Sequence, residues 1–255
     1  MITNAMQSKF GYEWGQQFTP PRSFEFAGRT ISLRFENLEA KAEFTDDTHV
    51  IWTADRGREE TSYFCLKSTD RVYLIAFGFQ GDRCITLIVD TETSLVTLHE
   101  TSFDAEKRPY TSAVLFGILD DGTPGDGQKP LPAELHGYTK DLAGHAILWI
   151  FNDTYWHVES YTEDECTHNS NEPAVDGKGP YKAVKITDTL YYMINGDSFE
   201  SICMIYNLRN LTCVGRSVVY DSSGGPLPQG AVGKYSDTAE LPEKITIVTE
   251  GIPKR

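Results

Sequence analysis

Short alternations of apolar and polar residues run through the chain and predict β-strands. Ile31, Leu33 and Phe35 alternate with polar neighbours, which is the period-two pattern of a half-buried strand. No stretch of about 12 or more residues keeps the 3.6-residue period of an amphipathic helix. Short apolar runs separated by polar turns follow at 63–67 and 72–77, at 84–89 and 95–98, and at 181–186 and 190–194. The pattern predicts an all-β fold of short antiparallel strands, as in barrels and sandwiches.

The two halves of the chain resemble each other in sequence. Tyr63–Phe77 aligns with Tyr181–Asn195 without a gap at an offset of 118 residues, and matching patches upstream have offsets of 116 and 117. Three matches in the same order indicate the duplication of a unit of about 116 residues. Each copy keeps a lysine beside its hairpin turn, Lys67 and Lys185, for which we expect a structural ion pair with a nearby acid.

The duplication predicts two domains. Residues 120–135 begin with a stretch rich in Gly, Pro and acidic residues, which is typical of a linker. We therefore expect an N-terminal domain at 1–119, a linker at 120–135 and a C-terminal domain at 136–255.

The charge of the chain limits the classes of partner. Lys and Arg number 23 and Asp and Glu number 37, which gives a formal net charge of −14. A chain this acidic has no electrostatic reason to bind nucleic acid or an anionic membrane surface. Its start lacks the pattern of a secretory signal, and its longest apolar run, Ala146–Phe151, is far shorter than the ~20 residues of a membrane span. We expect a cytoplasmic protein, and a homodimer is left open.

Cysteines and cofactor motifs add little chemistry. The five cysteines are odd in number and lack a C-x-x-C spacing, so they form a poor disulfide framework. The sequence also lacks a dinucleotide fingerprint, a P-loop, a nucleophile elbow and an H-E-x-x-H motif. Cys166 and His168 offer two metal ligands, whereas a zinc site needs three or four. The sequence predicts neither a cofactor nor a metal.

Three short stretches of the second copy resemble the MoaF family. They are His136–Gly144, with the sequence HGYTKDLAG, Tyr155-Trp-His157, and Lys185-Ile-Thr-Asp-Thr-Leu-Tyr191. The resemblance extends over most of residues 25–220. The chain departs from the family pattern at 165–168, where it has Glu-Cys-Thr-His.

This resemblance implies a fold and a range of functions. Family members pair an N-terminal with a C-terminal calycin-like β domain, so the expected fold is two duplicated antiparallel barrels of the calycin or lipocalin type. Such barrels hold small, mainly apolar ligands in a mouth lined by aromatic side chains. The family is named for molybdenum cofactor biosynthesis. The wider calycin group contains both small-molecule carriers and cofactor-free enzymes such as phenolic acid decarboxylases.

The repeat points to one face of one strand as a candidate site. At an offset of 117, the apolar face Leu38, Ala40, Ala42 and Phe44 aligns with Tyr155, His157, Glu159 and Tyr161. If the register is kept, four titratable side chains point into the second barrel. Buried groups of this kind cost several kcal/mol unless they are paired, so such a set is usually functional or tightly hydrogen-bonded.

The proposed roles follow from the chemistry of these side chains. His157 is expected to act as the general acid or base, with the Glu159 carboxylate orienting it. Tyr155 and Tyr161 are expected to donate phenol protons to an oxyanion or a ligand. The alternative is a change of register: the offset shifts between Phe151 and Tyr161, and one extra residue after the strand would turn His157 outward to solvent.

Further aromatic residues are expected to line a ligand pocket. They are Trp149, Tyr181 and Tyr191 in the second copy and Trp52 in the first.

The leading hypothesis is a cofactor-independent enzyme, a lyase, isomerase or cyclase, that acts on a small hydrophobic or aromatic metabolite by acid–base chemistry. The reaction would be an isomerisation, cyclisation, decarboxylation or dehydration. The alternatives are a non-catalytic carrier of small molecules and an auxiliary protein of molybdenum cofactor biosynthesis.

Overall fold

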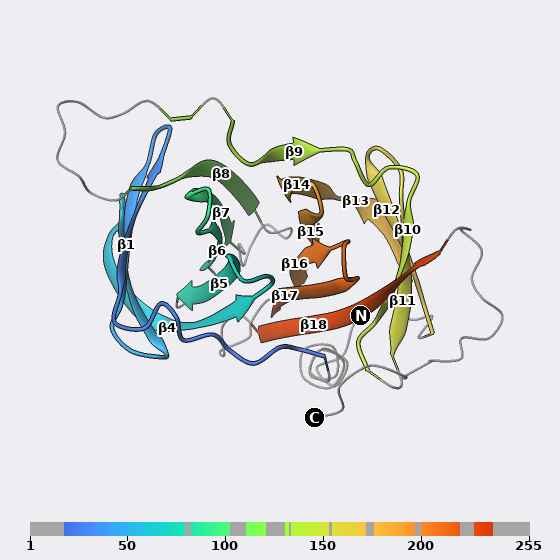
Figure 1. Ribbon diagram of the computed structural model, residues 1–255, viewed down its shortest axis with the longest axis horizontal. Helices are drawn as coiled ribbons and strands as arrows, with labels where there is room; N and C mark the ends of the chain where they lie inside the picture. The colour runs from blue at the N-terminus through green and yellow to red at the C-terminus, as the bar shows by residue number, and fades with distance from the viewer. Residues whose placement is uncertain are drawn as a thin grey trace.

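Two β units lie side by side in the molecule (Figure 1). A computed structural model of the chain describes residues 18–79, 83–102, 111–120, 131–132, 134–152, 155–171, 176–196, 200–219 and 227–236. These residues form eighteen strands, β1 to β18, which confirms the all-β prediction. In the same residues there is no helix long and apolar enough to cross a membrane.

The first unit is a closed antiparallel barrel. Each strand pairs with the next, and β8 returns to β1 with Leu33 opposite Leu119. The predicted alternation of 30–35 is the strand β1, whose inward residues include the buried Leu33 and Phe35. The strands are β1 (Thr30–Phe35), β2 (Glu39–Phe44), β3 (His49–Ala54), β4 (Gly57–Lys67), β5 (Val72–Phe79), β6 (Arg83–Asp90), β7 (Leu95–Ser102) and β8 (Thr111–Asp120).

The second unit is a ten-stranded sheet in the order β13-β12-β11-β10-β18-β17-β16-β15-β14-β9. The order ends at β13 and β9, so the described residues show one closed barrel, and the predicted second closed barrel is not shown. The strands are β9 (Gly137–Thr139), β10 (Ala146–Ile150), β11 (Trp156–Tyr161), β12 (Glu165–Ser170), β13 (Gly177–Pro180), β14 (Lys182–Thr187), β15 (Leu190–Gly196), β16 (Glu200–Asn207), β17 (Thr212–Val219) and β18 (Leu227–Ser236).

The pairings of the two units correspond. β10 pairs with β11 as β1 pairs with β2, and Trp149 lies opposite His157 as Leu33 lies opposite Ala40. β10 also pairs with β18 as β1 pairs with β8. Equal pairing and register in both units are what the sequence repeat requires, because a one-residue slip would exchange the two faces of a strand.

Glycines allow the close strand contacts in both units. A Cβ on Gly117 of β8 would lie 2.3 Å from the Arg34 carbonyl oxygen of β1. A Cβ on Gly215 of β17 would lie 2.2 Å from the Cys203 carbonyl oxygen of β16. No side chain fits at either distance, so only glycine permits these strands to pair as they do.

The units share a buried contact. An apolar cluster joins Leu74 and Ile88 of the first unit to Val184 and Ile205 of the second, among other residues. Arg216 of β17 is fully buried there, and its guanidinium donates to the hydroxyls of Thr86 and Thr101 and to the carbonyl and hydroxyl of Ser201. A buried arginine with this many acceptors fixes how the units meet. The expected linker lies mostly outside the described residues, since 121–130 and 133 are not among them.

Candidate functional site

Four predicted residues lie on the inward face of β11 and just before it. Tyr155, His157, Glu159 and Tyr161 are all buried. Val158, between two of them, packs on the opposite face against Ala146 and Leu148 of β10. The register of β10 and β11 places Glu159 opposite Ile147, a residue of the apolar interior of the second unit. The inward of the two registers considered from the sequence is therefore the one that the structure adopts.

The Glu159 carboxylate lies at the centre of a polar cluster inside the second unit. Its Oε2 accepts the hydroxyl of Tyr161 and, at 2.5 Å, the hydroxyl of Tyr206 from β16. Its Oε1 faces two imidazoles, with His157 Nε2 at 3.5 Å and His168 Nδ1 at 4.0 Å. Burial, and then the neighbouring carboxylate, raise the pKa of both tyrosines well above the usual value. Both phenols therefore stay protonated and keep donating to Oε2.

His157 is buried with one ring nitrogen partnered and the other not. Its Nδ1 lies 3.4 Å from the Tyr155 hydroxyl, whereas Nε2 has no hydrogen-bond partner within the described part of the chain. The ring packs against His168 and Phe151, at centroid distances of 4.0 and 4.8 Å. Burial, and then the second imidazole, hold the pKa of His157 well below its usual value, so the ring is neutral.

His168 and Tyr206 belong to the cluster, and the sequence did not assign them to it. His168 of β12 pairs directly with Glu159, and Cys166 pairs with Tyr161. Directly paired residues of an antiparallel pair share one face, so counting back across the turn after Tyr161 would have found His168. Tyr206 lies on β16, and no local pattern relates it to β11.

Trp149 belongs to the same interior. Its ring packs against Tyr206 at a centroid distance of 4.5 Å, and its indole Nε1 is buried without a partner in the described chain. Because Trp149 lies directly opposite His157, two buried nitrogens without a hydrogen-bond partner in the described chain belong to directly paired positions of neighbouring strands. An indole N–H can only donate, whereas the free nitrogen of a neutral imidazole can accept or donate.

The other three predicted pocket residues have structural contacts. Tyr181 donates its hydroxyl to the Thr162 carbonyl, and Tyr191 donates to the Asp141 carboxylate. Trp52 is buried in the apolar interior of the first barrel. Tyr181 also packs its ring against Tyr161 at a centroid distance of 5.1 Å and so borders the Glu159 cluster, which the contacts named for Tyr191 and Trp52 do not reach.

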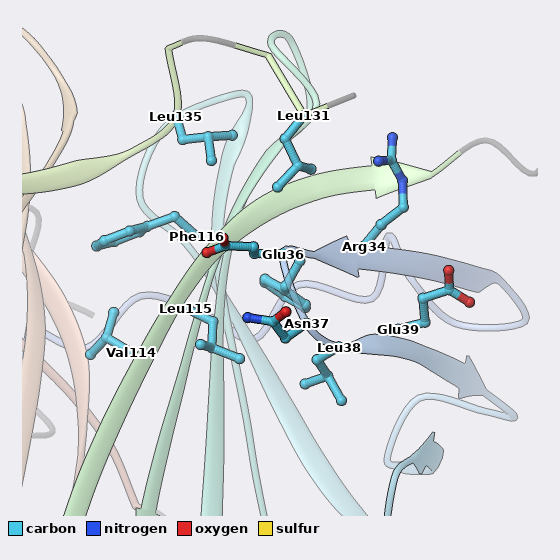
Figure 2. A pocket seen from close by; sticks show the side chains of 11 residues that line it. Arg34, Glu36, Asn37, Leu38, Glu39, Val114, Leu115, Phe116, Leu131 and Leu135 are labelled. Atoms are coloured by element: carbon cyan, nitrogen blue, oxygen red, sulfur yellow. The ribbon is translucent and has the colours of Figure 1, made fainter. Parts of the chain in front are cut away.

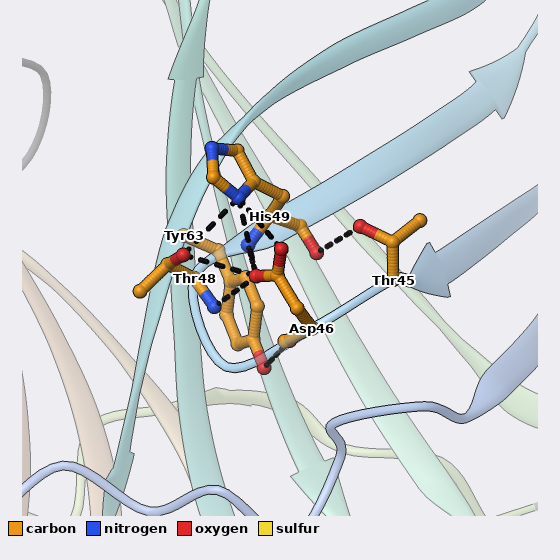
Figure 3. A network of polar contacts seen from close by, with 5 residues as sticks. All are labelled: Thr45, Asp46, Thr48, His49 and Tyr63. Atoms are coloured by element: carbon orange, nitrogen blue, oxygen red, sulfur yellow. Dashed lines mark hydrogen bonds and ion pairs between the residues drawn. The ribbon is translucent and has the colours of Figure 1, made fainter.

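A second histidine–carboxylate pair lies in the first unit, at the turn between β2 and β3 (Figure 3). Asp46 accepts the backbone N–H groups of Thr48 and His49, and His49 Nδ1 lies 2.9 Å from its Oδ2. These hydrogen bonds, with that from Thr48 N–H the largest cause, lower the pKa of Asp46. Both side chains of the pair are about half exposed, and the contacts are those of an ordinary turn.

A groove of about 780 Å³ opens at the edge of the first unit (Figure 2). Leu131 and Leu135 lie above β8, and Arg34, Glu36 and Leu38 come from β1 and the turn that follows. Among the described residues, the lining mixes apolar and charged side chains and contains no histidine or cysteine. The groove therefore carries exposed carboxylates among apolar side chains, whereas the buried cluster of titratable side chains predicted from the repeat lies in the second unit.

The cluster also has the composition of a metal site. The ligand atoms of His157, Glu159 and His168 all lie within 4.8 Å of one another. The sequence predicted no metal because Cys166 and His168 lacked a third ligand. The pairing of β11 with β12 brings two further ligands beside His168.

Two comparisons find proteins similar to parts of this chain. A solved structure from Burkholderia vietnamiensis, described provisionally as a beta-lactamase, is similar at 21% identity and a TM-score of 0.34; the match covers 40% of this chain and 98% of that one. A search of curated proteins finds no match. Residues 8–105 match the family model of the MoaF N-terminal domain. The motifs that resemble this family lie in the second copy of the repeat, whereas the family model matches the first copy. The two observations concern related sequences, because the copies resemble each other.

Proposed function

We propose that the second unit binds a small aromatic or largely apolar metabolite that carries an oxygen, and that it transfers protons on that molecule. The observation that carries the proposal is the pair of unpartnered nitrogens, Trp149 Nε1 and His157 Nε2, on directly paired positions. A buried polar atom without a partner costs about 1–3 kcal/mol. A ligand that accepts from the indole and exchanges a proton with the imidazole would supply both partners.

The contacts refine the roles within this proposal. Tyr155, at Nδ1, is the group that orients His157, because Glu159 Oε1 faces the other nitrogen. Nε2 is then the atom that accepts or returns a proton. Tyr161 holds Glu159 rather than a ligand oxyanion. Trp149 becomes the donor to the ligand oxygen, and the reaction class remains isomerisation, cyclisation, decarboxylation or dehydration.

A route to the site is offered at β12. The side chain of His168 is 26% exposed, whereas those of His157 and Glu159 are 8% and 4% exposed. A small molecule would therefore approach past His168, and the tightly packed interior limits its size.

We also propose that the second unit is a barrel of the calycin type. β13 and β14 are separated along the chain by Tyr181 alone. β13 pairs with β12, and β14 pairs with β15. The two halves of the single strand β4 pair with β3 and β5 in the same way. This correspondence supports a barrel whose fourth strand is interrupted at one residue.

A ligand screen followed by turnover measurement tests the proposed function. Oxygenated aromatic acids, phenols and enones are screened by tryptophan fluorescence, and ligands that bind are incubated and analysed by NMR for new products. Trp149→Phe keeps an aromatic ring but removes the N–H, so it should weaken binding about tenfold, as expected for a lost hydrogen bond of roughly 1.4 kcal/mol. Trp52→Phe, at an apolar position of the first barrel, is the matched control. His157→Ala should abolish turnover.

The proposal fails if no compound of these classes binds, or if Trp149→Phe binds as tightly as the wild type. Binding without product would instead support the second candidate, a non-catalytic carrier. One observation favours that candidate: Tyr161 and Tyr206 already donate to Glu159, so fewer hydroxyls remain for catalysis.

A further inference from the structure

Three metal-ligating side chains meet on the inward face of β11 and β12. Glu159 and His168 are direct partners across the strand pair, and His157 lies two positions from Glu159 on the same face. We propose that His157, Glu159 and His168 bind one divalent transition-metal ion, Zn²⁺, through His157 Nε2, Glu159 Oε1 and His168 Nδ1. This inference deepens the proposed function, because a bound ion would act on the same small molecule, but binding of the ion does not depend on that function.

The distances suit a metal site before the ion enters. Zinc bonds of about 2.0–2.2 Å in a tetrahedron hold two ligand atoms roughly 3.3–3.6 Å apart. Glu159 Oε1 lies 3.5 Å from His157 Nε2 and 4.0 Å from His168 Nδ1. The three ligand atoms all lie within 4.8 Å of one another, so the two imidazoles have to approach each other by up to about 1.5 Å when the ion binds. The His168 side chain is the most exposed of the three and so has the most freedom to turn.

The hydrogen bonds of His157 leave the correct atom free. When Nδ1 carries the proton toward the Tyr155 oxygen, 3.4 Å away, Nε2 is left with a lone pair, and this atom lies 3.5 Å from Glu159 Oε1. This nitrogen is buried and has no hydrogen-bond partner among the described residues. Metal-ligating histidines usually fix their tautomer in this way, through the nitrogen remote from the metal.

The two oxygens of Glu159 are divided between two tasks. Oε2 receives the hydroxyls of Tyr161 and Tyr206, so those bonds orient the carboxylate. Oε1 remains on the side of the histidines and can bind an ion through one oxygen. Ligating carboxylates are commonly held by such outer hydrogen bonds, and losing one costs about 10–100-fold in metal affinity.

Two histidines and one carboxylate leave a fourth position on a tetrahedral ion. Sites that keep such a position for water or substrate are typical of catalytic zinc. Trp149, opposite His157, has a free N–H that can donate to an oxygen bound there. With the ion bound, His157 Nε2 would be a ligand, so polarisation of the metabolite's oxygen by the ion would take the place of the proton transfer proposed for His157 in the metal-free protein.

Direct metal titration tests the inference. The full chain is stripped with EDTA, dialysed, and titrated with Zn²⁺ by calorimetry and with Co²⁺ by visible absorption. We expect one equivalent to bind, with Co²⁺ giving the intense d–d bands of a tetrahedral site. His168→Ala and Glu159→Gln should each weaken binding about 100-fold, and Tyr206→Phe about tenfold. His49→Ala, which disrupts the exposed pair with Asp46, is the matched control and should bind as the wild type does.

Two controls separate a loss of metal ligands from a loss of folding and from binding by the neighbouring thiol. Circular dichroism shows whether each variant folds, and His168→Ala is the decisive one because its side chain is partly exposed. Cys166→Ala should keep wild-type affinity, since the thiol is not among the three ligands. The inference is overturned if no one-to-one binding is seen, if folded His168→Ala binds as well as the wild type, or if Cys166→Ala loses binding.

The outcomes for the ion and for the small molecule are distinguishable. Zinc binding without any small-molecule binding leaves the metal site standing and rejects the proposed function. Small-molecule binding by the stripped protein, together with no zinc binding, rejects the metal site and leaves the proposed function standing.

Discussion

The interiors of the two units differ at corresponding positions of one frame. The pairs of matching residues, defined by strand pairing, are Ala40 and His157, Ala42 and Glu159, Phe44 and Tyr161, Trp52 and His168, and Val89 and Tyr206. All five residues of the first unit belong to its buried apolar cluster. In the second unit the same positions hold a carboxylate, two imidazoles and two phenols in mutual contact. One copy therefore fills its interior with apolar side chains, while the other places a cluster of polar, titratable side chains at the same positions.

The contacts that hold the frame have not changed. Tyr63 donates to the Asp46 carbonyl, and Tyr181 donates to the Thr162 carbonyl. In both units a lysine and a tyrosine also donate to the same carboxylate. Lys67 and Tyr73 donate to Glu25 in the first unit, and Lys185 and Tyr191 donate to Asp141 in the second. Duplication with divergence leaves such shared contacts in place, so they indicate structure, and the replaced positions indicate function.

The largest expected effect comes from placing a carboxylate in the first barrel. Ala42→Glu puts the counterpart of Glu159 among apolar side chains, where Val89 stands in place of Tyr206 and Phe44 in place of Tyr161. An unpaired buried charge should cost more than about 3 kcal/mol and leave little folded protein. Soluble yield and urea denaturation monitored by circular dichroism measure the loss.

Ala42→Met controls for side-chain volume in this experiment. Overpacking alone costs about 1–3 kcal/mol. If the methionine variant loses as much stability as the glutamate variant, the charge is not the cause of the loss. The first barrel would then exclude any larger side chain at this position and not a carboxylate in particular.

The next effect comes from removing one hydroxyl from the polar cluster. Tyr206→Phe leaves Glu159, 3% exposed, with one of its two tyrosine donors. The free energy of unfolding should fall by about 1–3 kcal/mol, the cost of an unsatisfied buried partner. Tyr73→Phe removes a similar 2.5 Å bond to Glu25, whose side chain is half exposed, and should cost clearly less because water replaces the hydroxyl. Equal losses from the two variants would contradict the special burial of Glu159.

The contact between the units should weaken in acid. Burial lowers the pKa of His136 from 6.5 to about 4, and its Nδ1 bonds the Thr97 hydroxyl of the first unit. Between pH 6.5 and pH 4, His136 is therefore protonated in the unfolded state but not in the folded state. The free energy of unfolding falls as the pH drops through this range. At pH 5 the loss from this group is about 2 kcal/mol.

Urea midpoints between pH 8 and pH 5 measure this loss. His136→Asn should flatten part of the pH dependence, whereas His145→Asn, at an exposed histidine of the second unit, should leave it unchanged. A pH dependence that is the same in His136→Asn and in the wild type would show that His136 titrates normally in the folded protein.

The sequence predicted those features of the fold that depend on residues close together along the chain. Period-two alternation located β1, and turn chemistry located the hairpins of β4 with β5 and of β14 with β15. The repeat favoured an inward Glu159 because Ala42, its counterpart, lies on an apolar face, and it left the outward register open as the alternative. Tyr206 could not be predicted in the same way, since its contact with Glu159 joins strands 47 residues apart. Side-chain contacts across a barrel depend on the tilt and stagger of all its strands, which no single segment encodes.

His168 shows where the prediction stopped short. The pairing of His168 could have been predicted from the turn between the two strands. Tyr161 and Cys166 pair on either side of this turn, and Glu159 and His168 are the next pair on the same face. His168 was instead considered with Cys166, its neighbour along the chain. On a strand those two residues do share a face, but the ligands that complete the set lie on β11, across the strand pair.

The smallest effect is expected at the two lysines, which behave alike in both units. Lys67 lies 2.7 Å from Glu25, and Lys185 lies 3.1 Å from Asp141 and 3.4 Å from Asp188, all among exposed side chains. Exposed ion pairs contribute little because water screens them. Lys67→Met and Lys185→Met should therefore each leave the urea midpoint unchanged within error and leave ligand and zinc binding intact. A loss of binding in Lys185→Met alone would show that the second unit has turned a shared structural contact into part of its site.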